Sequence, residues 1–237
     1  MITQTEGQIY LQEQRGCTDL SWYRSFHTFN YGSYFKEEKT AFGTLLAFNE
    51  DTLAAGKSIE MTPEENTEII ILPVAGGIEF KNPEGFVDYL TPGHAQVLRT
   101  DHRGPYQLLN PYGVESIHFL QIILRKGHNR SGEPKTSQFT FDPDLKNQLS
   151  VFYETEDALA SIGKYTGRED GIYELKNKEH GVFAFVIQGA FEVQERLLQP
   201  KDGLALWGLA AIEFEALSND AILLLIEVPR NQDRLPQ

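Results

Sequence analysis

The side chains whose types could support chemistry gather between residues 62 and 68. Thr62 offers a hydroxyl group, and Glu64, Glu65 and Glu68 offer carboxylates. An acidic cluster of this kind can act as a general base or hold a cation. The simpler interpretation is a solvated turn with one inward carboxylate. Because alternate side chains of a strand share a face, Thr62 and Glu64 are expected to point the same way. If strand pairing resumes in register after the turn, Glu68, Ile70 and Leu72 are expected to share that face.

Short apolar runs separated by turn residues are the elements that must position these side chains. The turns are marked by Gly, Pro and Asn, as in Asn82-Pro83-Glu84-Gly85 and Thr91-Pro92-Gly93-His94. Strand signals at this density are typical of an all-β sandwich or barrel. The clearest runs are residues 42–49, 69–80, 95–100 and 116–124.

The strand pattern is interrupted once and then repeats. Residues 125–138 are polar, contain Gly and Pro, and are locally basic, which is typical of a linker. The pattern of strand, glycine and strand at Ile69–Phe80 recurs at Val182–Val193. Internal repetition at this length indicates a duplicated barrel. We therefore predict an N-terminal barrel over residues 1–125, a linker over 126–139, and a C-terminal barrel with its tail over 140–237.

Composition restricts the partners and the compartment. The 237 residues carry a formal net charge of -13 at pH 7, which disfavours nucleic-acid backbones and anionic membrane surfaces. Cys17 is the only cysteine, so an intrachain disulfide and a thiolate metal cluster are excluded. The N-terminal stretch has no signal-peptide pattern, and no apolar run is long enough to span a membrane. A cytoplasmic protein is the default expectation.

Residues 21–35, SWYRSFHTFNYGSYF, are dense in aromatic side chains. They could form core at a barrel mouth, or they could form a binding surface. We favour core packing, because aromatic side chains mostly supply buried area. For His27, inside this segment, we expect a hydrogen-bonded structural role.

Several motifs together are similar to those of the pirin family. The segment Phe26–Tyr31 followed by Tyr34 resembles the family's N-terminal aromatic signature, and Asn49-Glu50-Asp51 resembles its Asn-Asp-Asp. The segment Asp202–Trp207 resembles its Asp-Gly-Leu-Ala-Ile-Trp. The resemblance covers about residues 10–229. It implies a bicupin, that is, two tandem jelly-roll β-barrels.

The resemblance also implies where a metal would be bound. Pirins hold one metal, usually iron, in the N-terminal barrel through three histidines and a glutamate. The matching positions here are Thr62, Glu64, Tyr106 and Leu108, with Asn110-Pro111 setting the register of the second pair. We therefore expect no bound metal and no other cofactor. We expect these four side chains to line a ligand pocket instead, with a hydrogen bond between Glu64 and Tyr106, either direct or through water.

Two further residues are candidates for the pocket or its mouth. Glu68 follows the first pair closely, and His102 lies in the polar loop 101–105. His102 could swing over the barrel mouth and supply a replacement ligand, although an exposed loop is the simpler interpretation.

Two functions compete, and the sequence leaves open whether the chain is an enzyme. Some pirins resemble quercetin 2,3-dioxygenase in activity, and the animal protein is a transcriptional co-regulator. The first hypothesis is a pirin-like bicupin that has lost the metal and binds a small molecule or protein partner, with no direct nucleic-acid contact and no membrane. The second is a quercetinase-like dioxygenase with a site rebuilt from Glu64, Tyr106, His102 or Glu68. Loss of the histidines favours the first.

Overall fold

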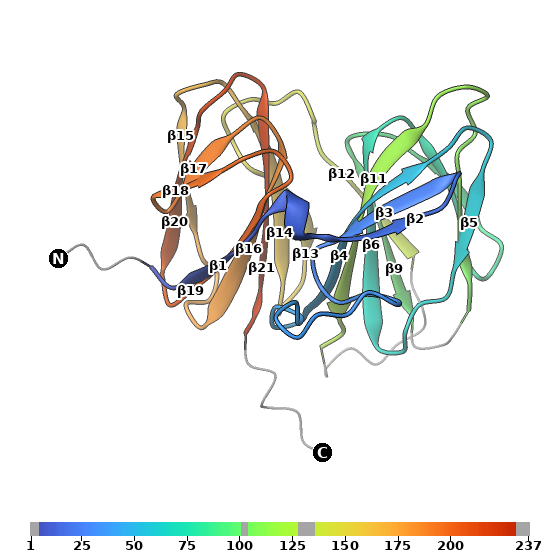
Figure 1. Ribbon diagram of the computed structural model, residues 1–237, viewed down its shortest axis with the longest axis horizontal. Coiled ribbons are helices and arrows are strands. Elements are labelled where there is room, and N and C mark those ends of the chain that lie inside the picture. Colours follow the sequence, from blue (N-terminus) through green and yellow to red (C-terminus); the bar gives the residue numbers. More distant parts are fainter. Residues whose placement is uncertain (1–4, 101–103, 128–135, 231–237) are drawn as a thin grey trace, which may run out of the picture. The chain divides into compact units, whose positions relative to one another are not determined.

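The computed structural model describes residues 5–100, 104–127 and 136–230, and it contains two compact units. The unit called here the N-terminal barrel comprises Gly16–Ala41 and Leu45–Thr140. The unit called the C-terminal barrel comprises Met1–Arg15, Phe42–Thr44 and Phe141–Gln237. Each unit is built from strands (Figure 1), which confirms the predicted all-β bicupin fold.

The N-terminal barrel consists of two antiparallel sheets. The larger sheet has the order β12-β9-β6-β11-β4-β3-β2, and the smaller has the order β5-β10-β7-β8. The strands of the larger sheet are β2 (Gly16–Asp19), β3 (Tyr23–His27), β4 (Leu45–Leu53), β6 (Thr67–Ala75), β9 (His94–Thr100), β11 (Ile117–Arg125) and β12 (Thr136–Thr140). Those of the smaller sheet are β5 (Ser58–Met61), β7 (Ile78–Lys81), β8 (Val87–Leu90) and β10 (Tyr106–Leu109).

The C-terminal barrel has the same plan. Its sheets have the orders β1-β19-β16-β21-β14-β13 and β15-β20-β17-β18. The larger sheet contains β1 (Gly7–Tyr10), β13 (Ser150–Glu154), β14 (Leu159–Tyr165), β16 (His180–Gln188), β19 (Gly203–Trp207) and β21 (Ala221–Pro229). The smaller contains β15 (Asp170–Glu174), β17 (Phe191–Val193), β18 (Arg196–Leu198) and β20 (Ala211–Ala216). A short 3-10 helix, η1 (Gln12–Gln14), follows β1.

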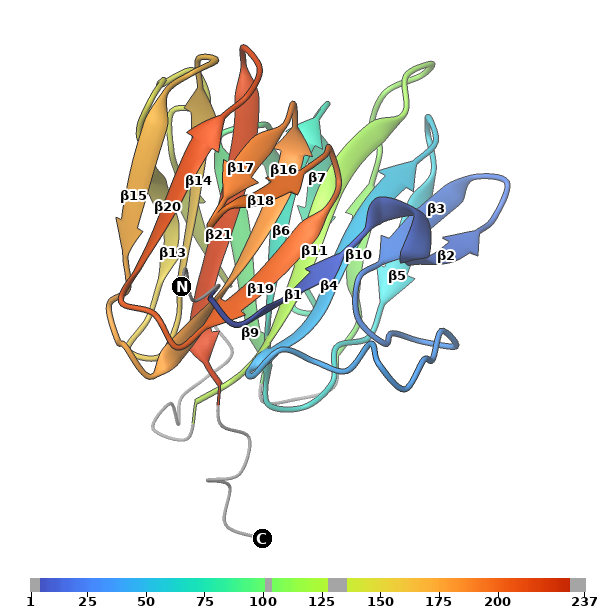
Figure 2. The same cartoon turned by 60° about the vertical axis from the view of Figure 1, so that its left-hand side comes forward.

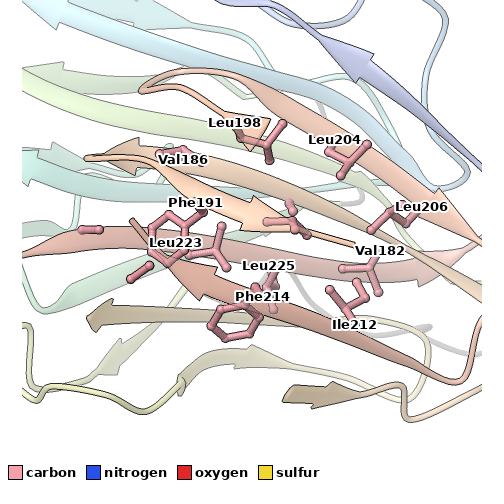
Figure 3. Close-up of a cluster of buried hydrophobic side chains, with 14 of the residues drawn as sticks. Val182, Val186, Phe191, Leu198, Leu204, Leu206, Ile212, Phe214, Leu223 and Leu225 are labelled. Atoms are coloured by element: carbon pink, nitrogen blue, oxygen red, sulfur yellow. The ribbon is translucent and has the colours of Figure 1, made fainter. Parts of the chain in front are cut away.

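Alternation along the strands directs apolar side chains into each barrel. In the C-terminal barrel, Val182, Ala184 and Val186 of β16 meet Leu223 and Leu225 of β21 in one buried cluster (Figure 3). In the N-terminal barrel, alternate residues of β6 and β11 form the corresponding cluster with the smaller sheet. Burial of these faces is the main favourable term that holds each pair of sheets together.

The predicted repeat is present in the structure. The first copy of the strand–glycine–strand pattern is β6, a corner at Gly76, and β7; the second is β16, a corner at Gly189, and β17. Both glycines have positive φ, 78° and 75°, where a side chain is disfavoured. The two corners therefore turn the chain from the larger to the smaller sheet in the same way.

The barrel boundaries differ from those expected at both ends. Strand β1 pairs with β19, so the first strand of the chain completes the C-terminal barrel (Figures 1 and 2). Strand β12 pairs with β9, so Thr136–Thr140 belongs to the N-terminal barrel and is not a linker. Residues 128–135 of the expected linker lie outside the described residues. We call this placement of β1 in the C-terminal barrel and of β12 in the N-terminal barrel the exchange. Sequence spacing did not predict it, because the sequence pattern of an edge strand does not determine its pairing partner.

Among the described residues, no helix has both the length and the apolar character needed to cross a membrane.

Candidate functional site

A cavity of about 540 Å³ lies in the N-terminal barrel. It is surrounded by the end of β5, the start of β10, the inward faces of β4 and β11, and the aromatic loop after β3. The lining residues are Asn30, Tyr31, Gly32, Tyr34, Phe35, Leu46, Ala47, Met61, Thr62, Pro63, Glu64, Ile69, Tyr106, Ile123 and Arg125.

Thr62 and Glu64 line the cavity from a loop, and the expectation that they share a strand face is wrong. Strand β5 ends at Met61, and both side chains are exposed. Pro63, between them, has no N–H to donate to a ladder, so the strand cannot continue through it. The two side chains therefore sit at the mouth of the cavity, where water reaches them.

Tyr106 and Leu108 both point into the apolar core cluster from β10. Their register is held by the buried Asn110, whose Nδ2 donates to the carbonyl oxygens of Leu53 at 3.0 Å and Glu115 at 2.8 Å. Tyr106 lines the cavity, whereas Leu108 is fully buried and is absent from the lining. The expected lining by all four residues is thus corrected for Leu108.

The Tyr106 hydroxyl makes no direct hydrogen bond to Glu64 among the described residues, so the direct form of the expected contact is wrong. Its oxygen lies 2.6 Å from Nε2 of Gln121, and its hydrogen is directed to Sδ of Met61 at 3.2 Å. Met61 is the residue of β5 that pairs with Tyr106. The sequence prediction missed Met61 because it placed the inward side chain at Thr62, whereas the inward residue of the strand is Met61, one position earlier.

A chain of buried amides continues from Tyr106 into the larger sheet. Nδ2 of Asn49 lies 3.1 Å from Oε1 of Gln121, and Nδ1 of His27 lies 2.9 Å from Oδ1 of Asn49. The other ring nitrogen of His27 lies 2.9 Å from the Thr18 hydroxyl oxygen. These contacts confirm the structural role expected for His27, which is 2% exposed. Cross-strand pairing places the three side chains, because His27, Asn49 and Gln121 are aligned on β3, β4 and β11.

A buried carboxylate lies one inward position further along β4. Asp51 is fully buried, and it contributes to the raised pKa values of the tyrosines around it. Burial, with smaller contributions from the negative charges of Asp51 and Glu64, raises the pKa of Tyr31 to about 12. Burial is also the main cause of the raised pKa of Tyr23 and of Tyr106. The three phenols are therefore protonated at neutral pH, and each has a hydrogen that it can donate.

The two additional candidates have different outcomes. Glu68 is buried and pairs with Arg99 at 3.2 Å, and it does not line the cavity. Its neighbour Ile69 does line the cavity, so Glu68 must face the other side of β6. The parity argument failed because the loop after Met61 breaks the alternation. His102 lies outside the described residues.

The aromatic segment divides between the two roles considered for it. Tyr23 and Phe29 are buried, as expected for core packing. Tyr31, Tyr34 and Phe35 line the cavity, and Phe35 is 76% exposed. The His27 ring lies 5.3 Å from the Tyr31 ring and 6.2 Å from the Tyr34 ring, measured between centroids. The last part of the segment is therefore an aromatic wall over the cavity.

The donor set at the implied metal positions does not fit the metal of the family. Leu108 has no donor atom, Thr62 has a neutral hydroxyl, and Tyr106 is a protonated phenol engaged with other side chains. Glu64 is the single carboxylate of the set, whereas such a centre needs imidazoles together with a carboxylate. Within the described ranges, no three His, Cys, Asp or Glu side chains are grouped as metal ligands would be.

Comparison with known proteins agrees with this architecture. The family model described as Pirin matches residues 10–124, and the one described as Quercetinase C-terminal cupin domain matches residues 155–228. An Escherichia coli K12 protein named quercetin 2,3-dioxygenase is 24% identical over 231 residues, which cover 93% of this chain and 99% of that protein.

Solved structures share the fold. The crystal structure of YhhW from Escherichia coli has a TM-score of 0.87 at 21% identity and covers 95% of this chain and 99% of its own. A quercetin 2,3-dioxygenase from Acinetobacter baumannii has a TM-score of 0.75 at 16% identity, covering 96% and 85%. Together, the two family matches span most of the chain, one in each barrel. The chain belongs to the pirin-like cupins.

Proposed function

We propose that this protein is a pirin-like bicupin that binds a small molecule in its N-terminal cavity without the family's metal site, as a binding or regulatory module. The observation that carries the proposal is the environment of Tyr106. At a position where the family has a metal-ligating histidine, its hydroxyl is held by Gln121 and Met61. A side chain fixed in this way serves recognition better than coordination.

The cavity has the general properties of a ligand site. It is concave, its wall is aromatic at Tyr31, Tyr34 and Phe35, and polar side chains such as Glu64 and Arg125 share the lining and could orient a ligand. The negative net charge, and a lining in which Arg125 is the single cation among the described residues, support a small-molecule or protein partner rather than nucleic acid.

A metal-dependent dioxygenase is the second candidate, and the names of the relatives favour it. The Escherichia coli protein that matches nearly the full chain is named quercetin 2,3-dioxygenase. For this chain, the activity would require a donor set rebuilt around Glu64 from residues that the family does not use. The carboxylate chemistry of Glu64 alone does not provide the ligand number of such a centre.

Metal content and turnover separate the two candidates. Untagged protein is analysed for bound metal, then assayed for quercetin turnover with added iron, nickel, copper and manganese. We expect much less than one metal per chain and no turnover. Stoichiometric metal with turnover that Glu64→Ala abolishes would establish the dioxygenase instead.

Binding itself is tested with naphthalene derivatives by saturation-transfer NMR. Thr62→Trp places a large side chain at the cavity mouth and should abolish binding, because Thr62 is an exposed lining residue. Glu65→Trp is the matched control, since Glu65 is exposed in the same loop but is not part of the lining. Binding that survives Thr62→Trp would place the ligand elsewhere and refute the proposed site.

A further inference from the structure

The hydrogen bonds beneath the cavity run in one direction. Nε2 of Gln121 lies 2.8 Å from Sδ of Met61, and a thioether sulfur accepts hydrogen bonds but cannot donate them. The amide nitrogen of Gln121 must therefore face Met61 and Tyr106, and its Oε1 must face Asn49. Asn49 then donates through Nδ2 and accepts at Oδ1 from Nδ1–H of His27. In this series of hydrogen bonds, from His27 through Asn49 and Gln121 to Tyr106, every donor therefore points toward the cavity.

This direction determines what Tyr106 offers to a ligand. Because Gln121 donates to the Tyr106 oxygen at 2.6 Å, the phenolic hydrogen is free to point away from Gln121. Its acceptor is the sulfur of Met61, a weak acceptor that also receives the Gln121 amide. An oxygen acceptor from a ligand would make a stronger hydrogen bond than this sulfur.

Tyr31 supplies a second donor in the same cavity. Within the part of the chain that the structure describes, its hydroxyl makes no hydrogen bond. Its raised pKa keeps the phenolic hydrogen in place at neutral pH, and its charge state affects that of Tyr106. Tyr31 and Tyr106 therefore both line the same cavity with protonated phenol groups.

The surrounding charges select among acceptors. The carboxylates of Asp51 and Glu64 act electrostatically on the Tyr31 hydroxyl. An anionic oxygen beside Tyr31 would be repelled by both carboxylates. Arg125, the one cation among the described lining residues, is exposed at the end of β11. A neutral oxygen keeps the two hydrogen bonds without this repulsion. The aromatic wall of Tyr34 and Phe35 suits a planar apolar body.

We propose that Tyr31 and Tyr106 donate hydrogen bonds to a neutral carbonyl or ether oxygen of an aromatic ligand. This inference rests on the proposed function and names the ligand chemistry that the cavity selects. Gln121 is then a positioning residue, since it fixes the direction of the Tyr106 hydroxyl without touching the ligand.

Three probes of one shape test the proposal: 2-acetylnaphthalene, 2-isopropenylnaphthalene and 2-naphthoate. They present a ketone, an alkene and a carboxylate at the same position. We expect the ketone to bind most tightly, and each of Tyr106→Phe and Tyr31→Phe to weaken it about 3- to 10-fold, the range for one hydrogen bond. Alkene affinity should be unchanged in both variants. Infrared difference spectra should show a carbonyl stretch lowered on binding and partly restored in each variant.

Tyr34→Phe is the control, because it removes a hydroxyl from the same lining without removing a proposed donor. Equal binding of ketone and alkene, or tightest binding of the carboxylate, overturns carbonyl recognition while leaving a binding cavity in place. If none of the three naphthalene probes binds, the proposed function is overturned as well. Tyr31 is only partly buried, so Tyr31→Phe remains informative if Tyr106→Phe unfolds the barrel.

Discussion

Gln121 is the residue on which the polar interior of the N-terminal barrel depends. It is fully buried, accepts from Asn49, and donates to both Tyr106 and Met61. All of its partners come from other strands, so its amide connects β4, β11, β10 and β5. A buried polar network stabilises only when its members are satisfied together.

Replacing Gln121 with Leu should therefore destabilise the protein. The change leaves Nδ2 of Asn49 without its acceptor, and the expected cost is about 1–3 kcal/mol in the free energy of unfolding. Urea denaturation measures it. Gln107→Leu, on the outer face of β10, is the control and should change stability by no more than about 0.5 kcal/mol. Equal effects of the two variants would contradict the network argument.

The candidate site could be predicted from the sequence only in part. The register of Tyr106 and Leu108 followed from Asn110-Pro111, because a buried asparagine with three backbone contacts holds β10 in place. The positions of Thr62 and Glu64 did not follow from strand parity, because Pro63 ends the ladder. The amide network could not be predicted, because it joins residues far apart in sequence that only strand pairing aligns.

At the scale of elements, the two glycine corners show why the fold could be predicted from the sequence. Each corner needs a positive φ directly after a long buried strand, and glycine marks that need locally. A Cβ at Gly76 would lie 2.7 Å from Cγ2 of Ile117, and one at Gly189 would lie 2.4 Å from Oγ of Ser218. Local signals of this kind define strands and corners, but they do not define which edge a terminal strand will join.

Alanine at either corner should destabilise the barrel that contains it. Gly76→Ala and Gly189→Ala combine left-handed strain of about 1–2 kcal/mol with overpacking of about 1–3 kcal/mol. Gly56→Ala isolates the strain, because Gly56 has positive φ and no atom within 4 Å of an added Cβ. Trp22 and Trp207, one in each barrel, report the unfolding of each by fluorescence. If Gly56→Ala lowered the free energy of unfolding as much as Gly76→Ala and Gly189→Ala do, the contacts of the added Cβ would contribute nothing.

At the scale of the whole molecule, buried tyrosines should make both barrels sensitive to alkali. Burial raises the pKa of Tyr10 and Tyr165 in the C-terminal barrel to about 12, as it does chiefly for Tyr31. The unfolded value is about 10. The contribution of these groups to stability is therefore complete below about pH 10 and is lost as pH rises through about 12.

Urea midpoints measured from pH 7 to 12 check this expectation. The stability of the wild-type protein relative to Tyr31→Phe should be constant up to about pH 9 and should then decline, because the variant lacks one ionising phenol. A difference that stays constant to pH 12 would contradict the raised pKa of Tyr31.

The exchanged strand β1 should contribute to the C-terminal barrel alone. Tyr10 is 3% exposed, and its ring lies 6.0 Å from that of Phe183, centroid to centroid. Tyr10→Ala should cost about 3–5 kcal/mol, as for other large core side chains, and Trp207 should report it in a Trp22→Phe background. Ile9→Ala is the control, because Ile9 is 41% exposed. If the loss were instead reported by Trp22 in a Trp207→Phe background, β1 would not be acting through β19.

The same exchange has a consequence for the order in which the chain is synthesised. Gly7 pairs with Leu206, so β1 leaves the ribosome long before its partner exists. Strand β9 likewise presents an open edge until Thr136–Thr140 has emerged. Until Thr136–Thr140 has been synthesised, β1 could therefore pair wrongly with the open edge of β9. The four-residue length of β1 and its three exposed residues limit this premature pairing, because a short edge strand pairs weakly on its own.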